Sequence, residues 1–217
     1  MTSLGKFGGM TMINRKFFFD HCRQVLFTGR LTKGQVAGLT FILDVWEKSH
    51  SKKDDRWLAY ALATAFHETA FQMQPIREFG GATYFFRMYD PKSSNARRAA
   101  LARSMGAIPG DGPIFYGRGY VQLTWRSNYA KMGKAFGLDL TSSSAAADRV
   151  LEPKLAAKIM FKGMEEGLFT GHKLADFFNP TTEDWKRARK IINGLDCAEI
   201  IEVYSRKFYS AISYTTG

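Results

Sequence analysis

The chain has 217 residues, of which 45% are apolar and 14% aromatic, and this composition supports a packed core and excludes wholesale disorder. Its 31 Lys and Arg residues outnumber its 20 Asp and Glu residues, and the resulting net charge of +11 favours a polyanionic partner. No apolar run is long enough to span a membrane. The two cysteines, Cys22 and Cys197, are far apart, so we expect no disulfide framework and synthesis in a reducing cytoplasm.

The start of the chain lacks the basic and then apolar pattern of an export signal. Residues 1–10 are rich in glycine and only weakly apolar. We therefore expect residues 1–12 to form a flexible lead-in, and we expect no export by the signal-peptide route.

Hydrophobic periodicity predicts helices over most of the chain. Thr32 is a candidate N-cap of the second helix, and Asp54 or the next residue is a candidate N-cap of the third, which Pro75 should stop. Gly137 suits the end of one later helix and Pro153 the first position of another. The expected helices are residues 16–27, 32–48, 54–73, 93–105, 127–136, 152–167, 182–192 and 197–212.

Strand signals occur at residues 82–89 and 114–123, which predict a small antiparallel β element. The sequence shows no internal repeat and no interdomain linker. We therefore predict a single domain over residues 1–217 that is mainly α with a minor β element.

The third predicted helix ends in an unusual way. Residues 57–66 are apolar nearly all round, which is typical of a helix buried on most sides, and Glu68 then follows on its last turns. An unpaired buried carboxylate is costly, so packing alone does not explain this glutamate. Apolar surroundings and the negative end of the helix dipole both favour a protonated carboxylic acid, the form that a general acid needs.

A second carboxylate, Glu78, lies in a different setting. It follows Pro75, has Arg77 as its neighbour and precedes two glycines, so we expect an ionised side chain in a solvated loop. Such a carboxylate suits a general base that activates water, and one protonated and one charged carboxyl group beside a cleft are typical of a glycosidase. The spacing alone also fits an exposed helix glutamate and a loop glutamate in an ordinary salt bridge.

Two motifs that would imply a metal or a cofactor are incomplete. The zinc-protease pattern needs a second histidine at position 71, where the chain has Phe71. The glycines at residues 117–119 lack the preceding buried strand and the Lys-Ser/Thr pair of nucleotide-binding loops. We therefore expect neither a metal nor a cofactor.

Three segments together resemble the family 19 glycoside hydrolases and the phage endolysins related to them. They are residues 65–69 (AFHET), residues 115–125 (FYGRGYVQLTW) with Asn128 and the tyrosine after it, and residues 191–194 (IING). They occur in the order found in the family, and the resemblance covers the chain from about Trp57 onward. It implies a lysozyme-like α+β fold in which the small β element lies beside the active-site cleft.

The resemblance also implies roles for single residues. Glu68 would be the general acid, Glu78 the general base, and Thr124 the hydroxyl that helps to hold the attacking water. Amide side chains suit the N-acetyl and hydroxyl groups of sugars, and Gln122 and Thr124 would face one side of an extended segment. The substrate-binding candidates are His67, Tyr116, Arg118, Gln122, Asn128, Asn193 and Arg206.

Some of these residues have a second interpretation. Tyr116 is of a type more often found in a core than on a sugar platform, and Arg118 also suits a structural ion pair. Asn193 with the glycine after it is also an ordinary helix cap. An approximate Glu-Asp-Thr spacing, as in phage lysozymes, would make Thr83 the hydroxyl partner, but we prefer Thr124.

Departures from the plant-type pattern point to the phage branch. Leu195 stands where plant-type members have a second glycine, Ser127 stands where they often have a tyrosine, and their disulfide framework is absent. We therefore expect an endolysin that hydrolyses the β-1,4 glycan of peptidoglycan with inversion at the anomeric carbon.

The expected partners follow from this hypothesis. They are the glycan strands of peptidoglycan and the anionic bacterial envelope, with no specific nucleic acid and no transmembrane segment. We expect a monomer that accumulates in the host cytoplasm and reaches the wall after the membrane is permeabilised. The alternatives are a chitinase acting on chitin oligomers, a non-catalytic glycan-binding lysis accessory protein, and a basic nucleic-acid-binding protein, for which no signature is present.

Overall fold

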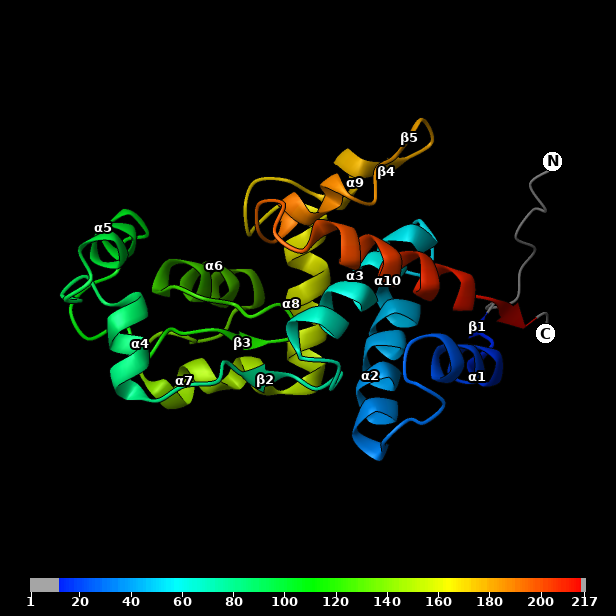
Figure 1. Cartoon of the computed structure of the whole chain (residues 1–217), viewed down its shortest axis with the longest axis horizontal. Helices are drawn as coiled ribbons and strands as arrows, with labels where there is room; N and C mark the ends of the chain where they lie inside the picture. The colour runs from blue at the N-terminus through cyan, green and yellow to red at the C-terminus, as the bar shows by residue number, and fades with distance from the viewer. Residues whose placement is uncertain (1–11, 216–217) are drawn as a thin grey trace.

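The computed structural model describes residues 12–215 of the chain (Figure 1). Its α-helices are α1 (Arg15–Val25), α2 (Lys33–Ser49), α3 (Asp55–Glu68), α4 (Ala82–Tyr89), α5 (Ala96–Ser104), α6 (Arg126–Phe136), α7 (Ser144–Asp148), α8 (Pro153–Glu166), α9 (Leu174–Phe177) and α10 (Ala198–Ala211). Two short 3-10 helices, η1 (Arg149–Leu151) and η2 (Arg187–Ile191), follow α7 and β5. The prediction of a mainly α fold is confirmed.

The strands form three small antiparallel pairs. They are β1 (Met12–Ile13) with β6 (Tyr214–Thr215), β2 (Ile76–Arg77) with β3 (Arg118–Gly119), and β4 (Phe178–Asn179) with β5 (Thr182–Glu183). Met12 therefore belongs to a paired strand and not to a flexible lead-in. The rest of the predicted lead-in, residues 1–11, lies outside the described residues.

Several helix ends follow from local chemistry as predicted. Thr32 caps α2 in a reciprocal capping box with Gln35, and Asp54 caps α3 by accepting from the backbone N–H of Arg56. Gly137 ends α6 in the left-handed conformation, and Pro153 is the first residue of α8.

Helix α3 is the centre of the main core. Every residue from 58 to 66 is buried, as the apolar sequence predicts, and α10 packs along this helix. A second apolar cluster surrounds Tyr129 and Met132 of α6 and Ile159 of α8. Figure 1 shows α8 in the middle of the molecule, with α4 to α7 on one side and α1, α2 and α10 on the other.

Helix α3 ends at Glu68, earlier than the predicted end near Met73. The Thr69 hydroxyl donates to the carbonyl of Ala65 (2.7 Å) and accepts from the backbone N–H of Met73 (3.0 Å). Three residues of the turn that follows, Ala70, Phe71 and Met73, have positive φ angles. The buried threonine thus closes the helix, and Glu68 is its last residue.

Residues 82–89 form helix α4, so the prediction of a strand was wrong. Aromatic residues favour strands locally, but a helix brings residues four apart onto one face. Phe85 and Tyr89 are related in this way. Phe85 stacks on Tyr116, with ring centroids 3.7 Å apart, and Tyr89 reaches Glu78. Tertiary contacts therefore decide the conformation.

Two other predicted elements are shorter or different. Residues 182–192 form strand β5, a turn and η2 instead of one α-helix. In residues 114–123 only β3 is a strand, with an isolated bridge between Arg118 and Leu123. No helix within residues 12–215 is long and apolar enough to cross a membrane.

Candidate active site

A cleft of about 410 Å³ opens where α3 ends, beside the loop before α6 and the exit of η2. Its lining combines one carboxylate and one guanidinium with amide, hydroxyl, aromatic and aliphatic side chains. The lining residues are Glu68, Tyr89, Arg98, Leu101, Met105, Val121, Gln122, Leu123, Thr124, Trp125, Asn128, Phe169, Thr170, Ile192 and Asn193.

Glu68 is paired with an arginine that the sequence analysis did not assign to the site. The guanidinium of Arg189, in η2, donates from Nη1 to Oε1 of Glu68 at 2.7 Å. The side chains of Arg189 and Glu68 are only 4% and 16% exposed. The Arg189 Nε also donates to the carbonyl of Asp196, which fixes the guanidinium between two elements. The expected apolar setting of Glu68 is therefore incomplete, because a cation contacts its carboxyl group.

Tyr60 lies two turns before Glu68 on α3 and is fully buried. Burial raises the pKa of its phenol, the Arg189 charge opposes this rise, and the Glu68 carboxylate adds to it. The Tyr60 hydroxyl has no hydrogen-bond partner within the described residues. The tyrosine therefore stays neutral beneath the Arg189–Glu68 pair.

Glu78 follows β2, and hydroxyl and backbone groups hold its carboxylate. The Tyr89 hydroxyl lies 2.8 Å from both carboxylate oxygens, the Tyr84 hydroxyl donates at 3.2 Å, and the backbone N–H of Gly117 donates at 3.1 Å. Burial and the Glu78 charge raise the pKa of Tyr89, which keeps that hydroxyl protonated and able to donate. Arg77, the cationic neighbour of Glu78 in the sequence, forms an ion pair with Asp148 instead.

Gly117 brings the segment of residues 115–125 against Glu78. The backbone N–H of Glu78 donates to the carbonyl of Gly117 at 2.8 Å, next to the β2–β3 pair. A Cβ at this position would lie 2.8 Å from Oε1 of Gln122 and 3.1 Å from Oε2 of Glu78. Only a glycine allows these two polar side chains to approach the backbone so closely.

The predicted amide and hydroxyl residues meet in the cleft. Gln122, Thr124, Asn128 and Asn193 all line it. Gln122 has a positive φ of 50°, and its amide donates to the carbonyls of Ile76 and Gly119. The Thr124 hydroxyl donates to the carbonyl of Gln122, and the Asn128 amide donates to the carbonyl of Thr124. The backbone between residues 119 and 128 is therefore fixed by the same side chains that face the cleft.

Arg118 is not in the cleft, and its assignment to substrate binding was wrong. Its side chain is fully buried, pairs with Asp148 at 2.7 Å and donates to the carbonyl of Ile114 at 2.7 Å. Its guanidinium lies 3.8 Å from the ring centroid of Tyr116. Tyr116 is therefore held between Arg118 and Phe85 and is also not among the cleft-lining residues. The structural interpretation of both residues is the one that the contacts support.

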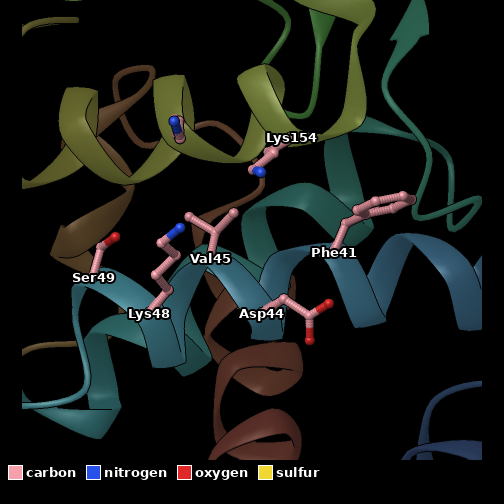
Figure 2. Close-up of a pocket in the computed structure, with 7 residues that line it drawn as sticks. Phe41, Asp44, Val45, Lys48, Ser49 and Lys154 are labelled. Atoms are coloured by element: carbon pink, nitrogen blue, oxygen red, sulfur yellow. The ribbon is translucent and has the colours of Figure 1, made fainter.

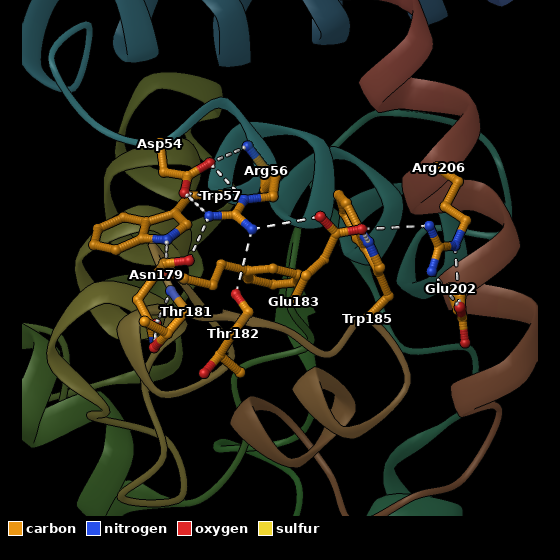
Figure 3. Close-up of polar contacts among 11 residues, drawn as sticks. Asp54, Arg56, Trp57, Asn179, Thr181, Thr182, Glu183, Trp185, Glu202 and Arg206 are labelled. Atoms are coloured by element: carbon orange, nitrogen blue, oxygen red, sulfur yellow. Dashed lines mark hydrogen bonds and ion pairs between the residues drawn. The ribbon is translucent and has the colours of Figure 1, made fainter. Parts of the chain in front are cut away.

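Arg206 and His67 are also outside the cleft lining. Arg206, on α10, pairs with Glu202 at 3.0 Å and with Glu183 at 3.5 Å, and it lies over the ring of Trp185 (Figure 3). These contacts belong to a surface network that joins β5 to α10. His67 is half-buried on the last turn of α3.

The residues that the sequence analysis missed are those that hold the two carboxylates. Arg189 lay in the predicted helix of residues 182–192, and its proximity to residues 191–194 was the only signal. Tyr89 lay in a predicted strand, eleven residues after its partner, and nothing local linked the two. Within residues 12–215, no group of three or more His, Cys, Asp or Glu side chains could hold a metal ion.

Comparisons with known proteins support the fold. Chitinase C from Streptomyces griseus superposes with a TM-score of 0.57 at 20% identity, covering 100% of this chain and 82% of the chitinase. A mutant of chitinase C gives a TM-score of 0.52 at 21% identity, covering 99% and 98% of the two chains. The chain therefore has the fold of these chitinases, a mainly α, lysozyme-like fold.

The sequence comparison is more restricted. A segment of 47 residues is 47% identical to inactive chitinase-like protein 1 from Hevea brasiliensis. This segment is 21% of the chain and spans only 15% of that relative's length. No model of a known protein family matches the chain.

Proposed function

We propose that the protein is a glycoside hydrolase of the family 19 type that cleaves β-1,4 bonds of bacterial peptidoglycan, as phage endolysins do. The observation that carries this proposal is the cleft itself. The cleft is lined by Glu68 together with Gln122, Thr124, Asn128 and Asn193. Tyr89, whose hydroxyl contacts Glu78, also lines the cleft. The fold shared with chitinase C supports glycan hydrolysis.

In this mechanism Glu68 protonates the glycosidic oxygen while Glu78 activates a water on the opposite face of the sugar. Thr124 helps to hold that water, and the three amide side chains bind the N-acetyl and hydroxyl groups. Arg189 and Tyr89 position the two carboxyl groups. A single displacement of this kind inverts the anomeric carbon.

Digestion of purified peptidoglycan tests the proposal. Mass spectrometry of the fragments identifies the bond that is cut and whether water is the acceptor, and NMR of fresh products gives the anomer. We expect inverted products from the wild type and no products from Glu68→Gln or Glu78→Gln. Glu199→Gln is the matched control, because Glu199 is 82% exposed and, within the described part of the chain, pairs only with Lys186 at the surface. Retained anomers, or full activity in both active-site variants, would refute the mechanism.

A chitinase is the second candidate, and the fold supports it as well as it supports an endolysin. Turnover of soluble chitin oligomers, measured beside that of peptidoglycan, separates the two. A non-catalytic glycan-binding lysis protein is the third, and the short match to a relative named inactive is the observation in its favour. This third candidate predicts binding without cleavage of either polymer. The side chains that orient the two carboxyl groups, Arg189 at Glu68 and Tyr89 at Glu78, argue against it.

The remaining expectations complete the proposal. We infer that residues 1–217 act as one catalytic domain and as a monomer. The protein would accumulate in the cytoplasm of the host and act on the wall after the membrane is opened. Its excess of basic residues would favour contact with the anionic envelope.

A further inference from the structure

A second hollow, of about 270 Å³, lies between α2 and α8 and shares no lining residue with the cleft described above. Three lysines surround an apolar floor. The lining residues are Phe41, Asp44, Val45, Lys48 and Ser49 of α2 and Lys154 and Lys158 of α8 (Figure 2). We refer to it as the lysine groove.

The three lysines of this groove have no anionic partner among residues 12–215. Lys48, Lys154 and Lys158 are exposed, and none of them forms an ion pair or hydrogen bond with a described residue. Figure 2 shows Lys48 and Lys154 pointing from opposite helices into the space between α2 and α8. Lys154 and Lys158 are one turn apart and therefore share a face of α8. Positive charge from two elements thus converges without compensation.

The one acidic residue of the lysine groove does not neutralise it. Asp44 forms an ion pair with Arg15 at 2.8 Å, on the α1 side. In Figure 2 its carboxylate points away from the gap that Lys48 and Lys154 enter. The Asp44 carboxylate therefore faces Arg15, which it shares with Glu47, and not the groove lysines.

The start of α8 lies beside the lysine groove. Its N-cap residue, Glu152, makes no side-chain cap hydrogen bond, and the first turn contains no acidic residue. Lys154 is the second residue of this helix. The N-terminal end of a helix carries a partial positive charge and unpaired backbone N–H groups, which favour phosphate groups. The carboxylate of Glu152 opposes this effect at the N-cap itself, so the lysines are the groups that favour an anionic ligand.

The floor of the lysine groove is apolar. Phe41 is 40% exposed, and Val45 beside it is buried. A partly exposed aromatic ring offers a flat surface to the C–H face of a sugar. The volume is below the usual 300–1,000 Å³ of small-molecule pockets, roughly the size of one sugar with its phosphate.

We propose that the lysine groove binds a phosphate-bearing glycan of the bacterial envelope, with the lysines holding the phosphate and Phe41 the sugar. The choice of an envelope polymer rests on the proposed function. A nucleic acid is disfavoured, because single DNA-binding modules bury roughly 600–1,000 Å² of protein surface, and a hollow lined by seven residues is a smaller contact. The groove would hold the enzyme on the envelope without taking part in cleavage.

Calorimetric titration of the full chain with glucose 1-phosphate tests the site directly. We expect saturable binding to the wild type that weakens with salt, and no binding of glucose. The variant Lys48→Gln/Lys154→Gln/Lys158→Gln should bind about tenfold more weakly or worse. Lys33→Gln/Lys52→Gln/Lys134→Gln removes the same charge from exposed positions outside the lysine groove and should bind as the wild type does. Equal losses in both triple variants, or none in the first, would overturn the proposal.

A second experiment separates this proposal from the proposed function. The Glu68→Gln protein is sedimented with cell walls before and after chemical removal of their phosphate polymers, so that no cleavage is needed. The proposal is supported if the protein no longer binds walls that lack the phosphate polymers, and if the variant without the groove lysines no longer binds intact walls. This result would hold even if the wall is not the substrate. Tighter binding of a DNA oligonucleotide at the groove would overturn it in favour of nucleic acid. Cleavage of small soluble substrates by the groove variant should be unchanged.

Discussion

Helix α2 contacts the turn after α3 at Gly38. Even a methyl side chain at this position should strongly destabilise the fold. A Cβ at Gly38 would lie 1.5 Å from the carbonyl oxygen of Met73 and 2.6 Å from its carbonyl carbon. Met73 is held at a positive φ of 53°, and its N–H is bonded to Thr69, so the obstacle is backbone that cannot rotate away. Helix and turn must therefore separate by more than about 1 Å to restore an ordinary contact distance.

Overpacking of a core typically costs about 1–3 kcal/mol and more where the backbone must move. We expect Gly38→Ala to lower the free energy of unfolding by at least about 3 kcal/mol. For a chain of this size that corresponds to a fall in Tm of about 6–12 °C. Because residues 69–75 join Glu68 to the strand before Glu78, cleavage should fall even where the variant is still folded.

Gly34→Ala is the matched control, one turn earlier in the same helix. The nearest atom to a Cβ there is Cγ of Gln74 at 3.8 Å, an ordinary contact. Alanine favours helix over glycine by up to about 1 kcal/mol, so this variant should be as stable as the wild type or slightly more stable. Urea unfolding followed by circular dichroism measures both. Equal stability of the two variants would refute the reasoning.

Three further predictions concern the groups around the site. Tyr89→Phe removes the hydroxyl that donates to Glu78. We expect the free energy of unfolding in urea to fall by about 1–2 kcal/mol, and kcat to fall with little change in KM. An unchanged kcat would contradict this prediction. Arg118→Met leaves Asp148 without its buried partner and should destabilise the fold by about 3 kcal/mol, as thermal unfolding would show; a neutral effect would mean that the pair is not structural. Burial raises the pKa of Asp148, but Arg77 and Arg118 outweigh this effect, and the net pKa is lowered. The ionised carboxylate therefore stabilises the fold at pH values above its ordinary pKa of about 4, and this contribution is lost as the pH falls below that value. In Asp148→Asn the free energy of unfolding should depend less on pH in the acid range. An unchanged pH dependence would contradict the assignment.

Local signals in the sequence predicted much of the helical framework. The capping box at Thr32, the cap at Asp54 and the proline at the start of α8 act over one helical turn, so they can be recognised from neighbouring residues alone. The apolar run of α3 predicted its burial for the same reason. Where a local preference competed with distant contacts it failed, as at α4, where aromatic residues that favour strands form a helix against Tyr116.

The candidate site shows the same division. The sequence by itself pointed to Glu68 at the end of a buried helix and to the residues of segment 115–125, because their types and order are visible in the chain. Only the tertiary structure decided what each of them contacts. Arg189, 121 residues from Glu68, supplies the cation that the apolar pattern did not reveal, and Arg118 lies in the core although its segment lines the cleft. Hydrogen bonds and ion pairs depend on distance in space, and a linear pattern records that distance only within a helix turn or a strand pair.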